Sequence, residues 1–143
     1  PDFNTYQKHI QANARQLAES LIAEGLAIVS GGTDNHLMTV DLRPIKMTGK
    51  KACAILEEVN ITTNKNAIRN DPEKPMVTSG IRLGTPAVTS RGMQVAEMKV
   101  IAHAIGETLK APEDEAVRKK TLSTVEDLCK KFPLYENKLQ AVR

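Results

Sequence analysis

The 143-residue sequence contains no tryptophan, two phenylalanines and two tyrosines. Its core must therefore consist mainly of leucine, isoleucine, valine, methionine and alanine side chains. No hydrophobic run approaches the roughly 18 apolar residues of a membrane-spanning helix, and no cleavable secretory signal is recognisable. We therefore expect no membrane association. We also expect a single domain over residues 1–143, a length at which a chain buries about two thirds of its unfolded surface.

Cysteine is almost as scarce as the aromatic residues. Cys53 and Cys129 lie far apart along the chain, which argues against a disulfide framework or a cysteine zinc site. We expect both to be buried, reduced thiols of a cytoplasmic protein. The histidines His9, His36 and His103 share no metal-ligand spacing, so no metal site is predicted. His36 follows a turn directly, and we expect its side chain to bond to a backbone group.

Charge of one sign is not concentrated in any segment. The formal net charge is +3, and the densest basic clusters lie at residues 118–120 and 130–131. Both clusters belong to a predicted helix whose other face is apolar, and no aromatic residues are interleaved with them to stack on bases. We therefore do not expect nucleic acid as a partner. Phosphate-binding glycine loops and the HExxH and GxSxG motifs are also missing.

Apolar periodicity and turn residues divide the chain into eight elements. We predict a helix over 4–24, strands over 26–29 and 36–42 joined by a turn, a helix capped by Thr48, a strand over 60–63, a loop over 64–78, a strand around Arg82, a helix from Thr89 or Ser90, and a last helix from 111–113 to Phe132. The order is helix, two strands, helix, two strands, two helices. This order predicts an α+β fold in which helices cover one face of a small, mostly antiparallel sheet.

Arg82 is the most informative position in the chain. It lies on a predicted strand between Ile81 and Leu83, which face one way while Arg82 faces the other. Gly80 and Gly84 flank this strand and allow another backbone or a ligand to come close. A guanidinium on such a stiff strand suits a bidentate grip on a carboxylate. Taken alone, the segment favours a different interpretation, a surface arginine that is solvated or ion-paired.

The predicted loop over residues 64–78 is the second candidate site. Asn64, Lys65 and Asn66 supply two amides and one ammonium before the chain reverses. Amides can read the donor and acceptor edges of a flat heterocycle, and an ammonium suits a carboxylate or a phosphate. A solvated surface loop is the alternative that composition favours. However, loops of this length without regular structure are uncommon in a compact domain and are often functional.

Four segments, taken together, resemble a known family. They are Ser30–His36 (Ser-Gly-Gly-Thr-Asp-Asn-His), Asn64–Asn66, Asn70–Pro72 and Thr78–Pro86. In this order and spacing they resemble the C-terminal part of serine hydroxymethyltransferase. The resemblance runs from about Tyr6 to Tyr135, which is nearly the whole chain. No single one of these motifs would be specific, but four in one order are.

The resemblance implies a pyridoxal-phosphate enzyme of the aspartate aminotransferase fold type. Such an enzyme interconverts serine plus tetrahydrofolate and glycine plus 5,10-methylenetetrahydrofolate, and it assembles as a homodimer or larger. The resemblance implies that Arg82 binds the amino-acid carboxylate and that Asn66 hydrogen-bonds the folate pterin, with Lys65 beside it. It assigns His36 no catalytic role. Members bind pyridoxal phosphate through a Schiff-base lysine in a preceding large domain, and no lysine here has the matching context.

We therefore expect this chain to be an inactive fragment that holds no catalytic, cofactor-binding or metal-binding residue of its own. Its start at Pro1, without an initiator methionine, fits a fragment or a processed chain. Ala67, Arg69 and Met76 depart from the residues common in the family, which predicts a more flexible folate-side loop. Two alternatives stay open: the small domain of another pyridoxal-phosphate enzyme, and a standalone module that binds carboxylates or folate.

Overall fold

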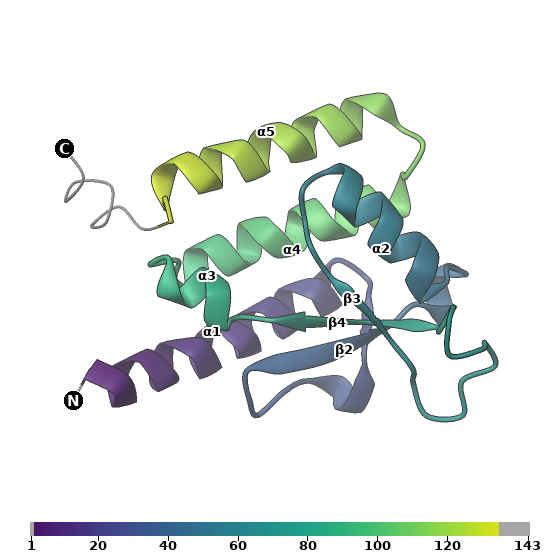
Figure 1. Ribbon diagram of the computed structural model, residues 1–143, viewed down its shortest axis with the longest axis horizontal. Coiled ribbons are helices and arrows are strands. Elements are labelled where there is room, and N and C mark those ends of the chain that lie inside the picture. The colour runs from purple at the N-terminus through teal and green to yellow at the C-terminus, as the bar shows by residue number, and fades with distance from the viewer. Residues whose placement is uncertain (1, 135–143) are drawn as a thin grey trace.

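A four-stranded sheet carries helices on one face in the computed structural model, which describes residues 2–134 (Figure 1). The helices are α1 (Asp2–Ala23), α2 (Gly49–Glu58), α3 (Pro86–Ser90), α4 (Val95–Lys110) and α5 (Glu115–Lys131). The strands are β1 (Ala27–Ile28), β2 (Leu37–Asp41), β3 (Asn64–Asn66) and β4 (Gly80–Gly84), and short 3-10 turns follow β1 (Val29–Gly31) and β2 (Arg43–Ile45). The predicted α+β class and the order of elements are confirmed, with one additional short helix.

The strands are arranged in the order β1-β2-β4-β3, and every neighbouring pair is antiparallel. Strand β4 is therefore held on both sides, by β2 and by β3. Alternation along β2 and β4 buries one face of the sheet: Met38 and Val40 pack there with Ile81 and Leu83. These side chains join the aliphatic core formed with α1, α2 and α4. The opposite face of β4 is left to Arg82, as the sequence predicts.

Local capping explains the end of α1 and the starts of α2 and α5. Gly25 ends α1 with φ of +88°, a conformation that glycine adopts without steric cost. The Thr48 hydroxyl accepts a hydrogen bond from the Lys51 backbone N–H at 3.2 Å and so begins α2, as predicted. Helix α5 starts three residues after the predicted opening at Pro112, where the Asp114 carboxylate caps it.

The third strand does not lie where the sequence predicts it. We expected a strand over 60–63 and a loop over 64–78, but Asn64–Asn66 forms β3, and residues 61–63 form no regular structure. Asparagine and lysine have low strand propensity, and the segment has no apolar residue that could alternate with polar ones. Neither signal therefore marks it as a strand. Backbone pairing with β4 decides the outcome instead, because the side chains of an edge strand can remain exposed. The first strand is also shorter than predicted, at two residues.

The helix predicted from Thr89 or Ser90 is in fact two helices, α3 and α4. Pro86 starts α3 immediately after β4, because its fixed φ suits a first helical turn. Gly92 then reverses the backbone with φ of +95°. Helix α4 begins afresh at Val95 behind a capping box formed by Gln94 and Glu97.

Several side-chain expectations also need correction. Cys129 is exposed, and Cys53 is half-buried beside Thr63, whose hydroxyl donates to its sulfur at 3.3 Å. His9 and His103 are exposed, as expected for helix surfaces. The His36 ring is also exposed and bonds to none of residues 2–134. Its backbone oxygen instead accepts from the Thr85 N–H at 3.0 Å, which fastens the end of β4 to the start of β2.

We expect Gly80→Ala to destabilise the protein by about 1–3 kcal/mol, the usual cost of overpacking a well-packed site. A Cβ added at Gly80 would lie 2.7 Å from the Asn66 backbone oxygen and 3.0 Å from the Val40 backbone oxygen. These oxygens belong to the strands on either side of β4, so neither can move without disturbing the sheet. The free energy of unfolding, obtained from urea denaturation, measures the effect.

Gly84→Ala is the matched control at the other end of β4. A Cβ there would lie 3.4 Å from the His36 backbone oxygen, which is an ordinary contact. The described residues thus crowd Gly80 but leave room for a methyl group at Gly84. We expect Gly84→Ala to change the free energy of unfolding by less than about 0.5 kcal/mol. Equal destabilisation by both substitutions would contradict this account of β4.

Candidate functional site

Arg82 lies in a row of polar residues on the face of the sheet that helices do not cover. Its cross-strand partners are Thr39 on β2 and Asn64 on β3. Residues directly opposite one another in a sheet share a face, so these three side chains stand side by side across three strands. Arg82 and Asn64 are exposed and Thr39 is half-buried, whereas Ile81 beside them is fully buried on the other face.

The Arg82 guanidinium makes no hydrogen bond or ion pair with any other residue in the described range 2–134. Three other arginines are engaged: Arg43 pairs with Asp41, Arg91 donates to a backbone oxygen and Arg118 pairs with Glu58. Arg15 and Arg69, like Arg82, make no such contact with the described residues, but neither lies on a strand. Of the two alternatives from the sequence, an ion-paired Arg82 is not seen among these residues, whereas an exposed, solvated Arg82 is. Five unused N–H donors on a fixed strand form a site that suits a carboxylate or another planar anion.

The register of β3 places the two residues expected to contact folate, Asn66 and Lys65, on opposite faces of the sheet. Asn66 lies opposite Gly80, so it shares the face of Arg82, and it is half-buried. Its side-chain nitrogen donates to the Ala67 backbone oxygen at 2.9 Å, which leaves the amide oxygen as a free acceptor within the described structure. Lys65 lies opposite Ile81 and therefore leaves the strand toward the other face. The structure thus groups Asn66 with Arg82 and places Lys65 apart from them.

A polar hollow adjoins this face. It has a volume of about 430 Å³ and is lined by residues 29–35 together with Leu37, Met38 and Thr39. Thr39, one of the residues that line the hollow, is the cross-strand partner of Arg82, but Arg82 itself does not line it. Residues 30–35 of the Ser-Gly-Gly-Thr-Asp-Asn-His segment thus line a hollow that shares only Thr39 with the polar row around Arg82. An apolar cavity of about 210 Å³ lies elsewhere, among α3, α4 and α5.

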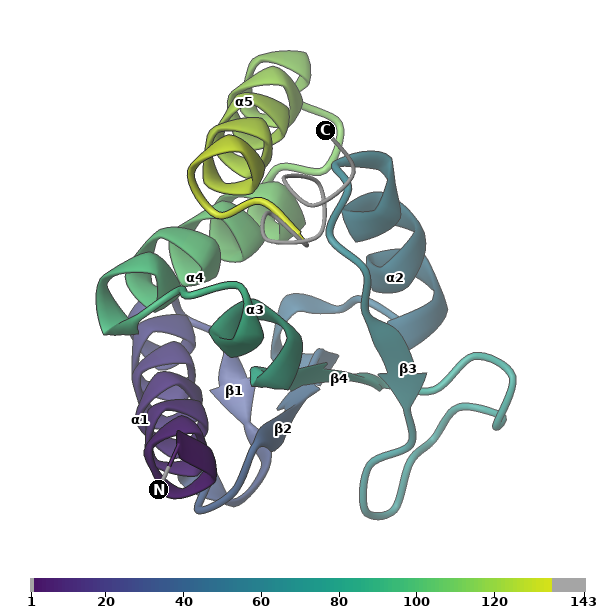
Figure 2. The same cartoon turned by 60° about the vertical axis from the view of Figure 1, so that its left-hand side comes forward.

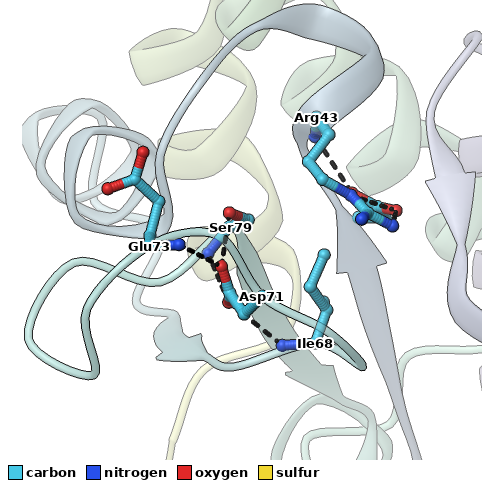
Figure 3. Close-up of polar contacts among 6 residues, drawn as sticks. Arg43, Ile68, Asp71, Glu73 and Ser79 are labelled. Carbon is cyan, nitrogen blue, oxygen red and sulfur yellow. Dashed lines mark hydrogen bonds and ion pairs between the residues drawn. The ribbon is translucent and has the colours of Figure 1, made fainter.

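Asp71 organises the loop between β3 and β4, a role that the sequence analysis did not identify. Its carboxylate accepts from the backbone N–H groups of Ile68, Glu73 and Ser79 at 3.2, 2.9 and 2.9 Å, and from the Ser79 hydroxyl at 2.6 Å (Figure 3). These bonds, led by the one from the Ser79 hydroxyl, hold the pKa of Asp71 well below its usual range. Asn-Asp-Pro is a turn sequence, and that signal could have suggested the role. The loop extends from the sheet away from the helices (Figure 2) but is anchored at its base.

An ion pair between Arg43 and Asp41 on the uncovered face was also not predicted from the sequence. The Arg43 Nη2 donates to Asp41 Oδ2 at 2.7 Å, and its Nε lies 3.0 and 3.1 Å from the two carboxylate oxygens. The hydrogen bonds from Arg43 lower the pKa of Asp41, and the same contacts raise the pKa of Arg43. The pair therefore stays charged on both sides at neutral pH.

One grouping of histidine and carboxylate side chains lies away from this face. Ligand atoms of Glu24, His103 and Glu107 fall within 4.8 Å of one another. Both Glu24 oxygens are already engaged, by His103 Nδ1 at 2.9 Å and by Lys110 Nζ at 3.4 Å. Chiefly because of the contact with His103, the pKa of Glu24 is lowered. These contacts fasten α1 to α4, and we assign them a structural role.

The donors on the uncovered face suit a carboxylate and a heterocycle. Arg82 offers a planar cationic fork, and Asn66 offers an amide. The only lysine within the four described strands is Lys65, and it lies on the opposite face. Among the described residues, no helix is both long and apolar enough to cross a lipid bilayer.

Comparisons with known proteins agree with these features. A family model described as serine hydroxymethyltransferase matches residues 1–105. The chain is 54% identical over 140 residues to a serine hydroxymethyltransferase of Myxococcus xanthus strain DK1622, covering 98% of this chain and 34% of the relative. It is 56% identical over 136 residues to that of Polynucleobacter necessarius subsp. necessarius strain STIR1, covering 95% and 33% respectively. The chain therefore spans about a third of the length of these curated relatives.

We expect Asp71→Asn to destabilise the protein at pH 7, because an amide NH2 would face backbone N–H groups that now donate to a carboxylate oxygen. The folded-state pKa of Asp71 is lowered, so its contribution is complete above the ordinary carboxyl pKa of about 3.9 and is lost as the pH falls below it. The urea midpoints of wild type and variant should therefore differ at pH 7 and converge toward pH 2.

Glu73→Gln supplies the control from the same loop. The Glu73 carboxylate makes no hydrogen bond or ion pair with the described residues, and only its backbone N–H contacts Asp71. We expect this variant to unfold like the wild type at both pH values. A difference between Asp71→Asn and wild type that persists unchanged down to pH 2 would show that the carboxylate charge is not responsible.

Proposed function

This chain belongs to the serine hydroxymethyltransferase family, and from that premise we propose that it supplies the amino-acid carboxylate site and part of the folate site of such an enzyme. The reaction would interconvert serine plus tetrahydrofolate and glycine plus 5,10-methylenetetrahydrofolate. The chain corresponds to about a third of its relatives' length. The activity is therefore proposed for the longer protein and not for these 143 residues alone.

The unpaired guanidinium of Arg82 is the observation that carries this proposal. Strand β4 is held on both sides by backbone pairing, so Arg82 starts from a fixed position with all its donors available. A bidentate contact to the α-carboxylate would fix the orientation of the bound amino acid. That orientation decides which bond at its central carbon stands perpendicular to the cofactor ring and so breaks most readily. Pyridoxal phosphate, when bound, acts as the electron sink for that step.

Asn66 is proposed to hydrogen-bond the pterin of tetrahydrofolate. Its position on the face of Arg82 and its free amide oxygen support this role. Lys65 leaves β3 toward the other face, so we propose it only as a neighbour of that contact. Pyridoxal phosphate binding, assembly into a homodimer or larger oligomer, and a cytoplasmic location are likewise proposed for the longer protein. Family membership argues against the alternative that this chain is the small domain of a different pyridoxal-phosphate enzyme.

Arg82→Lys should weaken amino-acid binding in the full-length enzyme loaded with pyridoxal phosphate. A single ammonium cannot reproduce a forked contact, and losing one hydrogen bond to a charged group raises the dissociation constant for glycine about 10- to 100-fold. The KM for serine should rise in parallel. Titration of glycine, followed by the absorbance of the cofactor, measures the effect.

Arg118→Lys is the matched control, because Arg118 pairs with Glu58 and lies on α5, away from the uncovered face. It should bind glycine as the wild type does. Glycine affinity in Arg82→Lys within about twofold of wild type would refute the carboxylate role, since even a modest hydrogen bond contributes more than that.

Asn66→Ala tests the folate contact separately. Removal of one neutral hydrogen bond should raise the KM for tetrahydrofolate about two- to tenfold, while glycine affinity stays unchanged. Asn64→Ala, on the same strand and the same face, should have the smaller effect on tetrahydrofolate. Equal losses in both variants would indicate a general disturbance of β3 and would count against a specific role for Asn66.

A further inference from the structure

Two arginines on the uncovered side of the sheet differ in whether they have a partner. Arg82 has no partner among residues 2–134, whereas Arg43 holds both oxygens of Asp41. Arg43 lies in the 3-10 turn directly after β2, and its side chain is 49% exposed. A surface pair of this kind contributes little to stability. The position of the Arg43–Asp41 pair beside Arg82 points instead to an effect on Arg82.

Asp41 is the only carboxylate within the four described strands, and it lies next to Arg82. Arg82 faces Thr39, and Asp41 is two residues further along β2, opposite Gly80. Residues two apart on a strand share a face, so Asp41 and Arg82 are diagonal neighbours. Such neighbours lie about 7–8 Å apart, which is within reach of long side chains. An arginine beside a free carboxylate at this spacing would be expected to pair with it.

Arg43 prevents this pairing by occupying the carboxylate. Asp41 Oδ1 accepts from the backbone N–H and from Nε of Arg43, each at 3.0 Å, and Oδ2 accepts from Nη2 at 2.7 Å. Without the Arg43 side chain, the backbone bond would still hold Oδ1, but Oδ2 would be released. The nearby Asp71 is similarly occupied, since each of its oxygens accepts two hydrogen bonds from the β3–β4 loop (Figure 3).

We infer that Arg43 is a positioning residue: by sequestering Asp41, it keeps the Arg82 guanidinium free for the carboxylate of the amino-acid substrate. This inference rests on the proposed function of Arg82. A carboxylate attached to the neighbouring strand competes at a high effective concentration with one that must bind from solution. Releasing Asp41 would therefore inhibit substrate binding through a contact within the protein, while Arg82 itself stays in place.

Arg43→Met in the full-length enzyme with pyridoxal phosphate is the direct test, because methionine keeps the side-chain length but offers no donor. The dissociation constant for glycine and the KM for serine should rise about two- to fivefold, the factor that an exposed ion pair contributes. The kcat at saturating serine and the KM for tetrahydrofolate should not change. Arg43→Lys retains a cation beside Asp41 and should behave almost as the wild type.

The double variant Asp41→Asn/Arg43→Met decides whether Asp41 is the cause. With the competing carboxylate removed, the glycine dissociation constant should return to the wild-type value, and Asp41→Asn alone should leave it unchanged. Thermal melting of each variant reports whether the sheet still folds. Glycine binding that is equally weak in the single and double variants would overturn the inference, as would wild-type binding in Arg43→Met.

These outcomes are distinguishable from failure of the proposed function. If Arg82→Lys binds glycine as the wild type does, the carboxylate role of Arg82 is wrong, and the inference about Arg43 falls with it. If Arg82→Lys is impaired while Arg43→Met binds normally, the carboxylate role stands and only the sequestration of Asp41 is refuted.

Discussion

Backbone pairing on both sides of β4 is the constraint on which the rest of the site depends. Because β2 and β3 flank this strand, its register is fixed twice, and side-chain alternation then commits Ile81 and Leu83 to the core. Arg82 has no other direction available to it. Gly80 is part of the same constraint. The backbones of β2 and β3 come so close to it that a side chain at this position would push them away. The stability of the core thereby sets the position of a polar group that contributes nothing to that core.

A fixed position is useful only if the guanidinium stays unoccupied. Two carboxylates on the uncovered side of the sheet are engaged by donors of their own: Asp41 by Arg43, and Asp71 by its loop. Both carboxylates have lowered pKa values, so neither becomes neutral near pH 7. Among the described residues, Arg82 thus stays unpaired although Asp41, which Arg43 engages, is its diagonal neighbour on the sheet. This arrangement fits the capture of an external carboxylate better than it fits a contribution to folding.

The sequence predicts the parts of this structure that follow from local rules. Helix α1, the Thr48 cap and the outward direction of Arg82 all come from periodicity and capping, which act within a few residues. The position of β3 could not be predicted in this way, because Asn64–Asn66 becomes a strand only through pairing with β4, some sixteen residues further along the chain. The same non-local register decides that Asn66 shares the face of Arg82 while Lys65 does not. The Asp41–Arg43 pair and the four bonds to Asp71 were missed because they depend on side-chain geometry that composition does not encode.

The most direct test of the central claim is a crystal structure of the full-length enzyme with pyridoxal phosphate and glycine. We predict two guanidinium nitrogens of Arg82 at about 2.7–2.9 Å from the two carboxylate oxygens of glycine, with Asp41 still held by Arg43. A glycine carboxylate bound by other groups, with Arg82 paired to a protein carboxylate or directed away from the amino acid, would contradict it.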